Sequence, residues 1–154
     1  MHQRDADADG LDALSYLVKL YGFEAPLESA VSVAPGICEL LDLGGRHKTN
    51  LILHDLVALG VPLGRVLEIP HCQIVAFDDL RVALGWLYVS ERCLDAYVRS
   101  AWHDELTCAL DVAAATSDDE DVLVDAAVRA FVHRDSWLRT SFAQPPAWIA
   151  ASCS

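Results

Sequence analysis

Residues 80–102 read LRVALGWLYVSERCLDAYVRSAW, and this stretch decides the fold class. Its apolar residues recur every three or four positions, which is the spacing of one face of an α-helix. The stripe consists of Leu80, Leu84, Leu87, Leu94, Val98 and Trp102, with Glu91 as its polar exception. We therefore expect one long central helix, with Asp78 or Asp79 capping its start.

Gly85 is the only glycine of this stretch. A glycine inside a helix costs stability relative to alanine and usually has a packing or functional reason. We expect a neighbouring backbone or a ligand to come close to the helix at this position.

The segments before the central helix also show helical spacing. A stripe of Leu11, Leu14, Leu17, Val18 and Tyr21 predicts a helix that starts near Leu11. Pro26 is expected to kink or restart this helix, because proline lacks the backbone donor and crowds the previous turn. One turn of helix is predicted at residues 37–41. Another helix is predicted over NLILHDLVALG, capped by Thr49 or Asn50 and ended by Gly60 in the left-handed conformation.

The remaining segments complete an all-α prediction. Residues 61–77 contain Pro62, Gly64 and Pro70 and read as a broken connector. Residues 104–115 are expected to continue helically at an angle, and a capping box of Ser117 and Glu120 predicts a last helix that reaches residue 138. We divide the chain into a flexible acidic N-terminus at residues 1–10, one helical domain at residues 11–142 and a tail at residues 143–154.

Composition excludes several classes of partner. The chain has 154 residues, 53% of them hydrophobic, and a net charge of −12 with only 11 scattered Lys and Arg. We therefore expect no nucleic acid and no anionic membrane as a partner. Five cysteines without a CxxC pair, together with the lack of a signal peptide or an apolar run of membrane-spanning length, predict a cytoplasmic location.

Four segments resemble one family in the same order. LGWLYVSERCLDA resembles the distal helix of bacterial, biliverdin-producing heme oxygenases of the phytochrome-associated type, through Gly85, Tyr88 and Glu91. LVKLYGFEAPLESAV resembles that family's second helix, and NLILHDLVALG and AVRAFVHRDSWL resemble two later helices. The resemblance implies a heme-oxygenase-like helical bundle, although a fold does not by itself confer an activity.

The same resemblance implies a degenerate active site. Arg92, Ala96 and Tyr97 stand where the family has glycines that let the distal helix lie against the porphyrin. Those side chains are expected to block the heme cleft. The family's iron-binding histidine lies on its first helix, upstream of the LYxF segment, and only twenty residues precede Tyr21 here. We expect that first helix to be missing, and we expect no cofactor and no metal site.

Three residues are the alternative ligands for heme or a metal. His2 is the only histidine upstream of Tyr21, and His71 with Cys72 lies beside Pro70 in an irregular loop. An imidazole or a thiolate in such a loop can ligate iron. No nucleophile elbow, Walker loop or dinucleotide fingerprint is present, so the sequence predicts no catalytic residues.

Two functions follow from these patterns. The first is a heme-oxygenase-like protein without oxygenase activity, which acts as a regulatory or protein-interaction module in bacterial sensory signalling, with a homodimer or a protein partner covering exposed apolar faces. The alternative is a biliverdin-producing heme oxygenase, or a heme- or bilin-binding protein, with an unconventional iron ligand. Heme is the cofactor only in that alternative.

Overall fold

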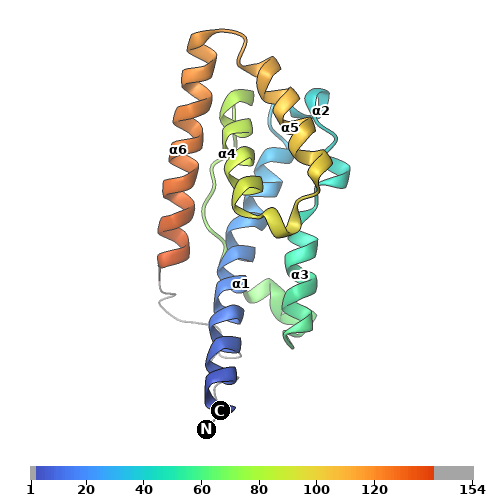
Figure 1. Cartoon of the computed structure of the whole chain (residues 1–154), viewed down its shortest axis with the longest axis vertical. Coiled ribbons are helices and arrows are strands. Elements are labelled where there is room, and N and C mark those ends of the chain that lie inside the picture. Colours follow the sequence, from blue (N-terminus) through green and yellow to red (C-terminus); the bar gives the residue numbers. More distant parts are fainter. Residues whose placement is uncertain (1–2, 141–154) are drawn as a thin grey trace.

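The computed structural model describes residues 3–140, and its regular elements in that range are helices throughout (Figure 1). The predicted all-α class is confirmed. Within residues 3–140 no helix is both long and apolar enough to cross a membrane. The α-helices are α1 (Gln3–Ser32), α2 (Ile37–Leu40), α3 (Lys48–Ala58), α4 (Leu80–Cys93), α5 (Ser100–Ala113) and α6 (Ser117–Arg139), and the 3₁₀ helices are η1 (Leu43–Gly45), η2 (Leu63–Glu68) and η3 (Asp95–Tyr97).

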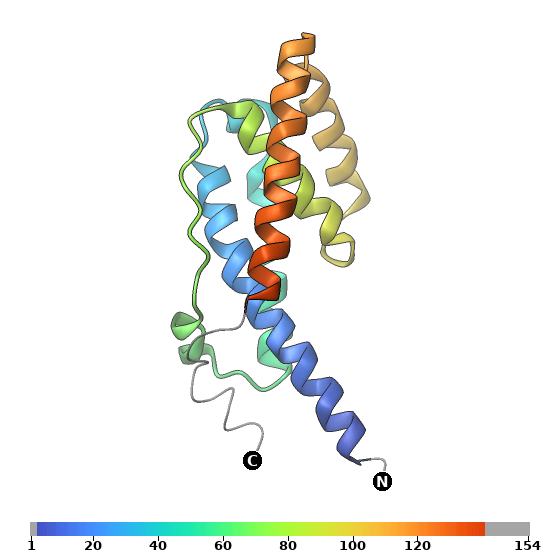
Figure 2. The same ribbon diagram turned by 90° about the vertical axis from the view of Figure 1, so that its left-hand side faces the viewer.

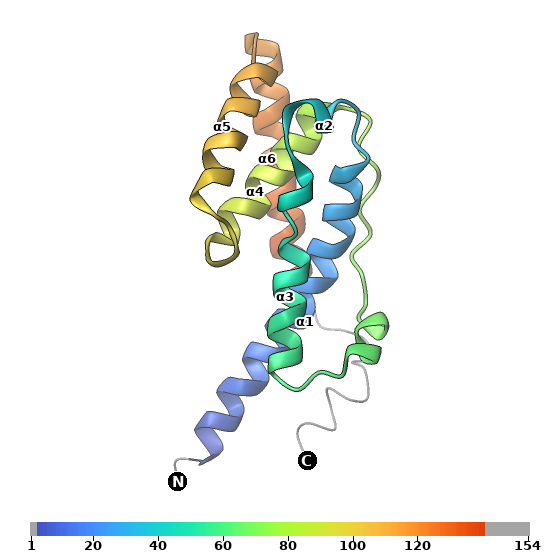
Figure 3. The ribbon, with the colours of Figure 1, turned by 90° about the vertical axis from the view of Figure 1, so that its right-hand side faces the viewer.

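The helices pack around α1 and α4. Helix α4 packs against α1 and α6, which also contact each other, and α5 returns along α4 on the side away from α6 (Figure 1). Helix α3 lies along α1, whose N-terminal part extends past the end of α3 (Figure 3). The predicted helix start near Leu11 is wrong, because α1 already begins at Gln3. The predicted domain limits stay predictions, and the tail at residues 143–154 lies outside the described residues.

The single long helix predicted over residues 80–102 is wrong. Helix α4 ends at Cys93, η3 forms a tight turn, and α5 begins at Ser100. The turn is favoured by its tertiary contacts: Leu94 is buried in a cluster with residues of α1 and α3, and the Tyr97 hydroxyl donates a hydrogen bond to Asp55 of α3. The apolar spacing continues past Cys93 because Leu94 and Val98 pack on this cluster, which contains residues of α1 and α3, and not because the helix continues.

The expected break at Pro26 is also wrong, since α1 runs through it without interruption. A proline at this position cannot donate to the carbonyl of Gly22, four residues earlier. The amide of Cys72 donates to that carbonyl instead, at 2.8 Å. Residues 70–79 run along α1 here (Figure 2), and a Cβ on Gly22 would lie 2.3 Å from the Pro70 carbonyl oxygen. The connector thus replaces the helix's own missing hydrogen bond.

Several local predictions are confirmed and two caps are corrected. Asp79 caps α4 by accepting from the Arg81 amide at 2.8 Å, and Gly60 has φ +95° after the end of α3. The turn of helix at α2 and the broken connector are also as predicted. The capping box of α6 is made by Thr116 and Asp119 instead of Ser117 and Glu120. Helix α3 has His47 at its N-cap instead of Thr49 or Asn50.

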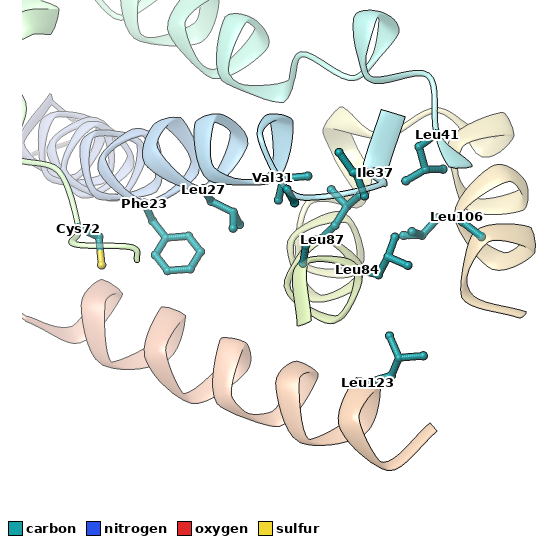
Figure 4. Packing of buried hydrophobic residues seen from close by; sticks show 13 residues of the cluster. Phe23, Leu27, Val31, Ile37, Leu41, Cys72, Leu84, Leu87, Leu106 and Leu123 are labelled. Carbon is teal, nitrogen blue, oxygen red and sulfur yellow. The ribbon is translucent and has the colours of Figure 1, made fainter. Parts of the chain in front are cut away.

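The main core lies where α1, α4, α5 and α6 meet (Figure 4). Phe23, Leu27 and Val31 of α1 pack with Leu84 and Leu87 of α4 in one buried cluster. Burying side chains of this size contributes about 1.5–3 kcal/mol each. A second cluster joins α1, α3 and the connector. The inward stripe predicted for the start of the central helix is therefore correct for α4.

Gly85 marks the closest approach of α4 to α6. A Cβ at this position would lie 2.8 Å from the Ala126 Cβ and 2.9 Å from the Leu123 carbonyl oxygen. Real Cβ atoms do not approach other atoms so closely, so a side chain would force the helices apart. The prediction of a close neighbour at Gly85 is confirmed, and the neighbour is the backbone of α6.

Replacing Gly85 with alanine is expected to lower the free energy of unfolding by about 1–3 kcal/mol, because overpacking outweighs alanine's better helix propensity. Urea denaturation followed by circular dichroism measures the change. Gly64→Ala is the matched control, since a Cβ on Gly64 meets nothing within 4 Å. Equal stability of Gly85→Ala and Gly64→Ala would contradict the assigned packing.

Candidate functional site

A group of buried polar side chains distinguishes the interior of this bundle. Its members come from four helices and from the segment before α3, and each is at most 8% exposed: Glu24, Arg46, Lys48, Ser90, Glu91 and Arg134. Charged side chains are rarely buried unless they are paired, because the interior solvates them poorly. The cluster is therefore the first place to look for function.

Arg46 connects helices α4 and α5. Its guanidinium forms a buried ion pair with Glu91 of α4, donates to the Trp102 carbonyl oxygen at 3.0 Å and reaches the Glu105 carboxylate at 2.9 Å. The guanidinium also lies 5.8 Å from the centre of the Trp102 ring. One side chain from an irregular segment thus fixes the end of α4 and the start of α5.

Glu24 is the other buried carboxylate and lies on α1. One of its oxygens, Oε2, accepts a hydrogen bond from the Ser90 hydroxyl at 2.7 Å. The other, Oε1, has no hydrogen-bond partner among the described residues. Burial raises the pKa of Glu24 above the usual carboxyl range, while Lys48, the Ser90 hydrogen bond and Arg134 each act to lower that pKa.

A cavity of about 170 Å³ adjoins these groups. Its lining residues come from α1, the segment around η1, the start of α3 and α4. Glu24, Arg46 and Lys48 line it together with apolar side chains. The apolar lining consists of Leu27, Val31, Leu43 and Leu87. A small concave space with apolar walls and a few convergent charges has the character of a binding site.

The rim of the cavity is held by Glu28. Its carboxylate accepts from the Thr49 amide at 3.1 Å and from the Thr49 hydroxyl at 2.7 Å, and it lies 3.1 Å from His47 Nδ1. Glu28 of α1 thereby caps the N-terminus of α3. The N-cap residue of α3, His47, makes no capping hydrogen bond with its side chain. The start of α3, and with it Lys48, is anchored to α1.

The residues predicted to block a heme cleft lie away from this cavity. Arg92 is exposed, with its guanidinium 5.4 Å from the Tyr88 ring centre. Ala96 and Tyr97 were expected on the distal helix, but they lie in η3 beyond its end. The three residues therefore do not share one helical face. Their role in excluding heme stays a prediction.

The alternative ligands are not brought together either. His71 is exposed and lies 6.1 Å from the Tyr21 ring, whereas Cys72 is buried with its Sγ 3.1 Å from His133 Nε2. Burial raises the pKa of the Cys72 thiol, which disfavours the thiolate that ligates iron. His2 lies outside the described residues. Within residues 3–140 no three His, Cys, Asp or Glu side chains are placed to hold a metal ion.

Of the residues that matched the family's distal helix, Glu91 alone joins the buried cluster. Gly85 contacts α6, and Tyr88 is exposed on the surface of α4. The partner of Glu91 is Arg46, which lies 45 residues away in the sequence. Arg46 follows Gly44-Gly45 in what reads as a turn, so no local pattern identifies it as buried.

Glu24 and Lys48 are likewise missed by sequence reasoning. Glu24 lies between Phe23 and Ala25 in a helix whose other face is polar, and Lys48 precedes the expected start of α3. Only a pattern that combined α1, α3 and α4 in space would have found them.

Comparison with protein-family models gave no match, and no significant similarity to a curated protein or a solved structure was found.

Changing Arg46 to methionine is expected to destabilise the protein by about 3–5 kcal/mol, because the fully buried Glu91 would lose its counter-charge. Thermal and urea unfolding measure the loss. Arg65→Met is the control: it removes an ion pair with Glu68 whose two side chains are about half exposed, and we expect a cost below about 1 kcal/mol. Similar losses in the two variants would refute the importance of the buried pair.

Proposed function

We propose that this chain is a heme-oxygenase-like helical module that acts by protein association and not by heme turnover. In this proposal α6 forms the contact surface and a second copy of the chain is the partner. The observation that carries the proposal is an apolar stripe on the outer face of α6. We define it as Val124, Val128, Phe131 and Val132.

Helix α6 is apolar on two opposite sides. Leu123, Ala126 and Ala130 are buried toward α4, as expected for a helix on the surface of a bundle. The outer stripe has the spacing of a second helical face, and its four side chains are between 56% and 61% exposed. No other described element covers this side of α6 (Figure 2). Contiguous exposed apolar faces of this kind often mark sites of association.

The charges along α6 favour a second copy in the antiparallel direction. The first turn carries Asp118, Asp119 and Glu120, and the last turn carries Arg139. Antiparallel pairing places Arg139, which also pairs with Asp135 of its own helix, near the acidic first turn of the other copy, and it opposes the two helix dipoles favourably.

Val128 lies midway along α6, so a two-fold axis near it suits this pairing. Such an axis would place Val124 of each copy near Val132 of the other. This is the self-complementary arrangement of a cyclic dimer.

Two observations support a role without heme. The cavity between α1, η1, α3 and α4 has about 170 Å³ and a second one between α4 and α6 has about 270 Å³, whereas sites for drug-sized ligands, which a porphyrin exceeds, occupy about 300–1,000 Å³. Arg92, Ala96 and Tyr97 also depart from the glycines of the family that the sequence resembles. By that resemblance we extend the proposal to a cytoplasmic regulatory role in bacterial sensory signalling, which rests on analogy.

The dimer is tested by changing Val128 to aspartate. Two carboxylates would then face each other in an apolar contact, so we expect the dissociation constant to rise by roughly a hundredfold or more. Sedimentation equilibrium measures it. Val112→Asp on α5 is the matched control, since Val112 is 64% exposed outside the stripe, and this variant should remain dimeric. A wild-type protein that is monomeric at all attainable concentrations would refute the proposal.

The absence of heme chemistry is tested by titration with hemin. We expect no saturable one-to-one Soret band and no biliverdin in the presence of a reductant. A tight band that disappears in His71→Ala, or conversion of the bound heme to biliverdin, would instead support the enzyme.

A further inference from the structure

We infer that the cavity between α1, η1, α3 and α4 binds a small aliphatic α-amino acid. This site is separate from the outer stripe of α6, and the inference goes beyond the proposed association. It rests on the buried charges that line the cavity, on the two of their polar atoms that have no hydrogen-bond partner among the described residues, and on the size of the space.

The cavity is lined by three buried charged side chains, two of which keep one polar atom without a hydrogen-bond partner among the described residues. Glu24, Arg46 and Lys48 are 1%, 3% and 3% exposed. Glu24 Oε1 and Arg46 Nε have no hydrogen-bond partner within residues 3–140. Lys48 acts electrostatically on Glu24, and among residues 3–140 no carboxylate lies within 4.0 Å of its ammonium. Buried groups of this kind are usually satisfied, so their convergence on one cavity indicates a polar ligand.

The signs of these groups select a zwitterion. Glu24 offers an acceptor that suits an ammonium group, while Lys48 and Arg46 Nε offer donors that suit a carboxylate. A simple carboxylate would satisfy the two cations but would bring a negative charge toward Glu24. A simple amine would satisfy Glu24 but would approach the ammonium of Lys48. An α-amino acid carries both groups on one carbon and satisfies both sides.

Among the other charges near the cavity, Arg134 of α6 acts electrostatically on Glu24 and keeps Nε and Nη2 without a hydrogen-bond partner within residues 3–140, but it does not line the cavity. The charges at the rim and on Arg46 are engaged. Glu28 at the rim is bound to His47 and Thr49. Arg46 keeps its Nη1 and Nη2 on Glu91, Glu105 and the Trp102 carbonyl, so only its Nε remains for a ligand. The rim therefore contributes little net charge, and Glu24 and Lys48 are the main determinants of specificity.

The size and the walls of the cavity define the side chain. A cavity of about 150 Å³ holds a molecule the size of benzene, so about 170 Å³ admits roughly six to eight non-hydrogen atoms. Amino acids from alanine to valine have this size. Leu27, Val31 and Leu87 form an apolar wall that suits an aliphatic side chain.

Isothermal titration of the full chain with L-valine tests the inference. We expect saturable one-to-one binding, with 3-methylbutanoate, which lacks the amino group, and 2-methylpropylamine, which lacks the carboxylate, each at least tenfold weaker. L-tryptophan should not bind, because it exceeds the cavity. No binding of L-valine at millimolar concentration would overturn the inference, and so would equal affinity for 3-methylbutanoate.

Two variants assign the ends of the ligand. The Lys48→Met variant should bind L-valine no more tightly than 2-methylpropylamine, because the partner of the ligand's carboxylate is lost. The Glu24→Gln variant should bind L-valine no more tightly than 3-methylbutanoate, because the partner of the ligand's ammonium group is lost. Arg92→Met is the control, since Arg92 is exposed outside the cavity, and Val128→Asp should bind L-valine as the wild type does.

Circular dichroism establishes whether each variant is folded. A folded Lys48→Met that keeps wild-type affinity and selectivity would refute the assignment. The ligand series on the wild-type protein decides the inference even if both variants fail to fold.

Discussion

The buried ion pair between Arg46 and Glu91 is the interaction on which the rest of this structure depends. Glu91 is completely buried on α4, and a carboxylate in that position is tolerated only with a counter-charge and hydrogen bonds. Arg46 supplies the charge from an irregular segment and binds the first two turns of α5 through Trp102 and Glu105. Lys48 follows two residues after Arg46, and the contacts of Glu28 with Thr49 hold this part of the cavity wall on α1 as well.

Helix α4 separates the two surfaces to which we assign functions. Gly85 lets α6 pack directly on one side of α4, while Leu87, two residues later, lines the cavity on the α1 side. Residues two apart on a helix point in nearly opposite directions. A ligand in the cavity would contact α1, α3 and α4, whereas a second copy would contact α6. Any coupling between them would have to pass through the packing of α4.

The sequence was sufficient to predict those elements whose structure depends only on residues close to them in the chain. The start of α4 at Asp79, the left-handed Gly60 and the helical course of α6 follow from capping, backbone freedom and apolar spacing. The close approach at Gly85 was also predictable, because a glycine in a helix requires a reason. The capping box was misplaced by one residue, since Thr116 and Ser117 are both able to cap.

Only the tertiary structure decided the features that depend on a distant partner. Pro26 remains inside α1 because the amide of Cys72 reaches the carbonyl of Gly22, and α4 ends at Cys93 because the following residues pack on α1 and α3. Glu91 is paired with Arg46, 45 residues away, and this contact leaves no local trace. By itself the sequence determined the all-helical class and the inward faces of the helices, since spacing and caps act within a few residues. The cavity, its charges and the uncovered face of α6 arise from the packing of separate helices, which sequence spacing does not encode.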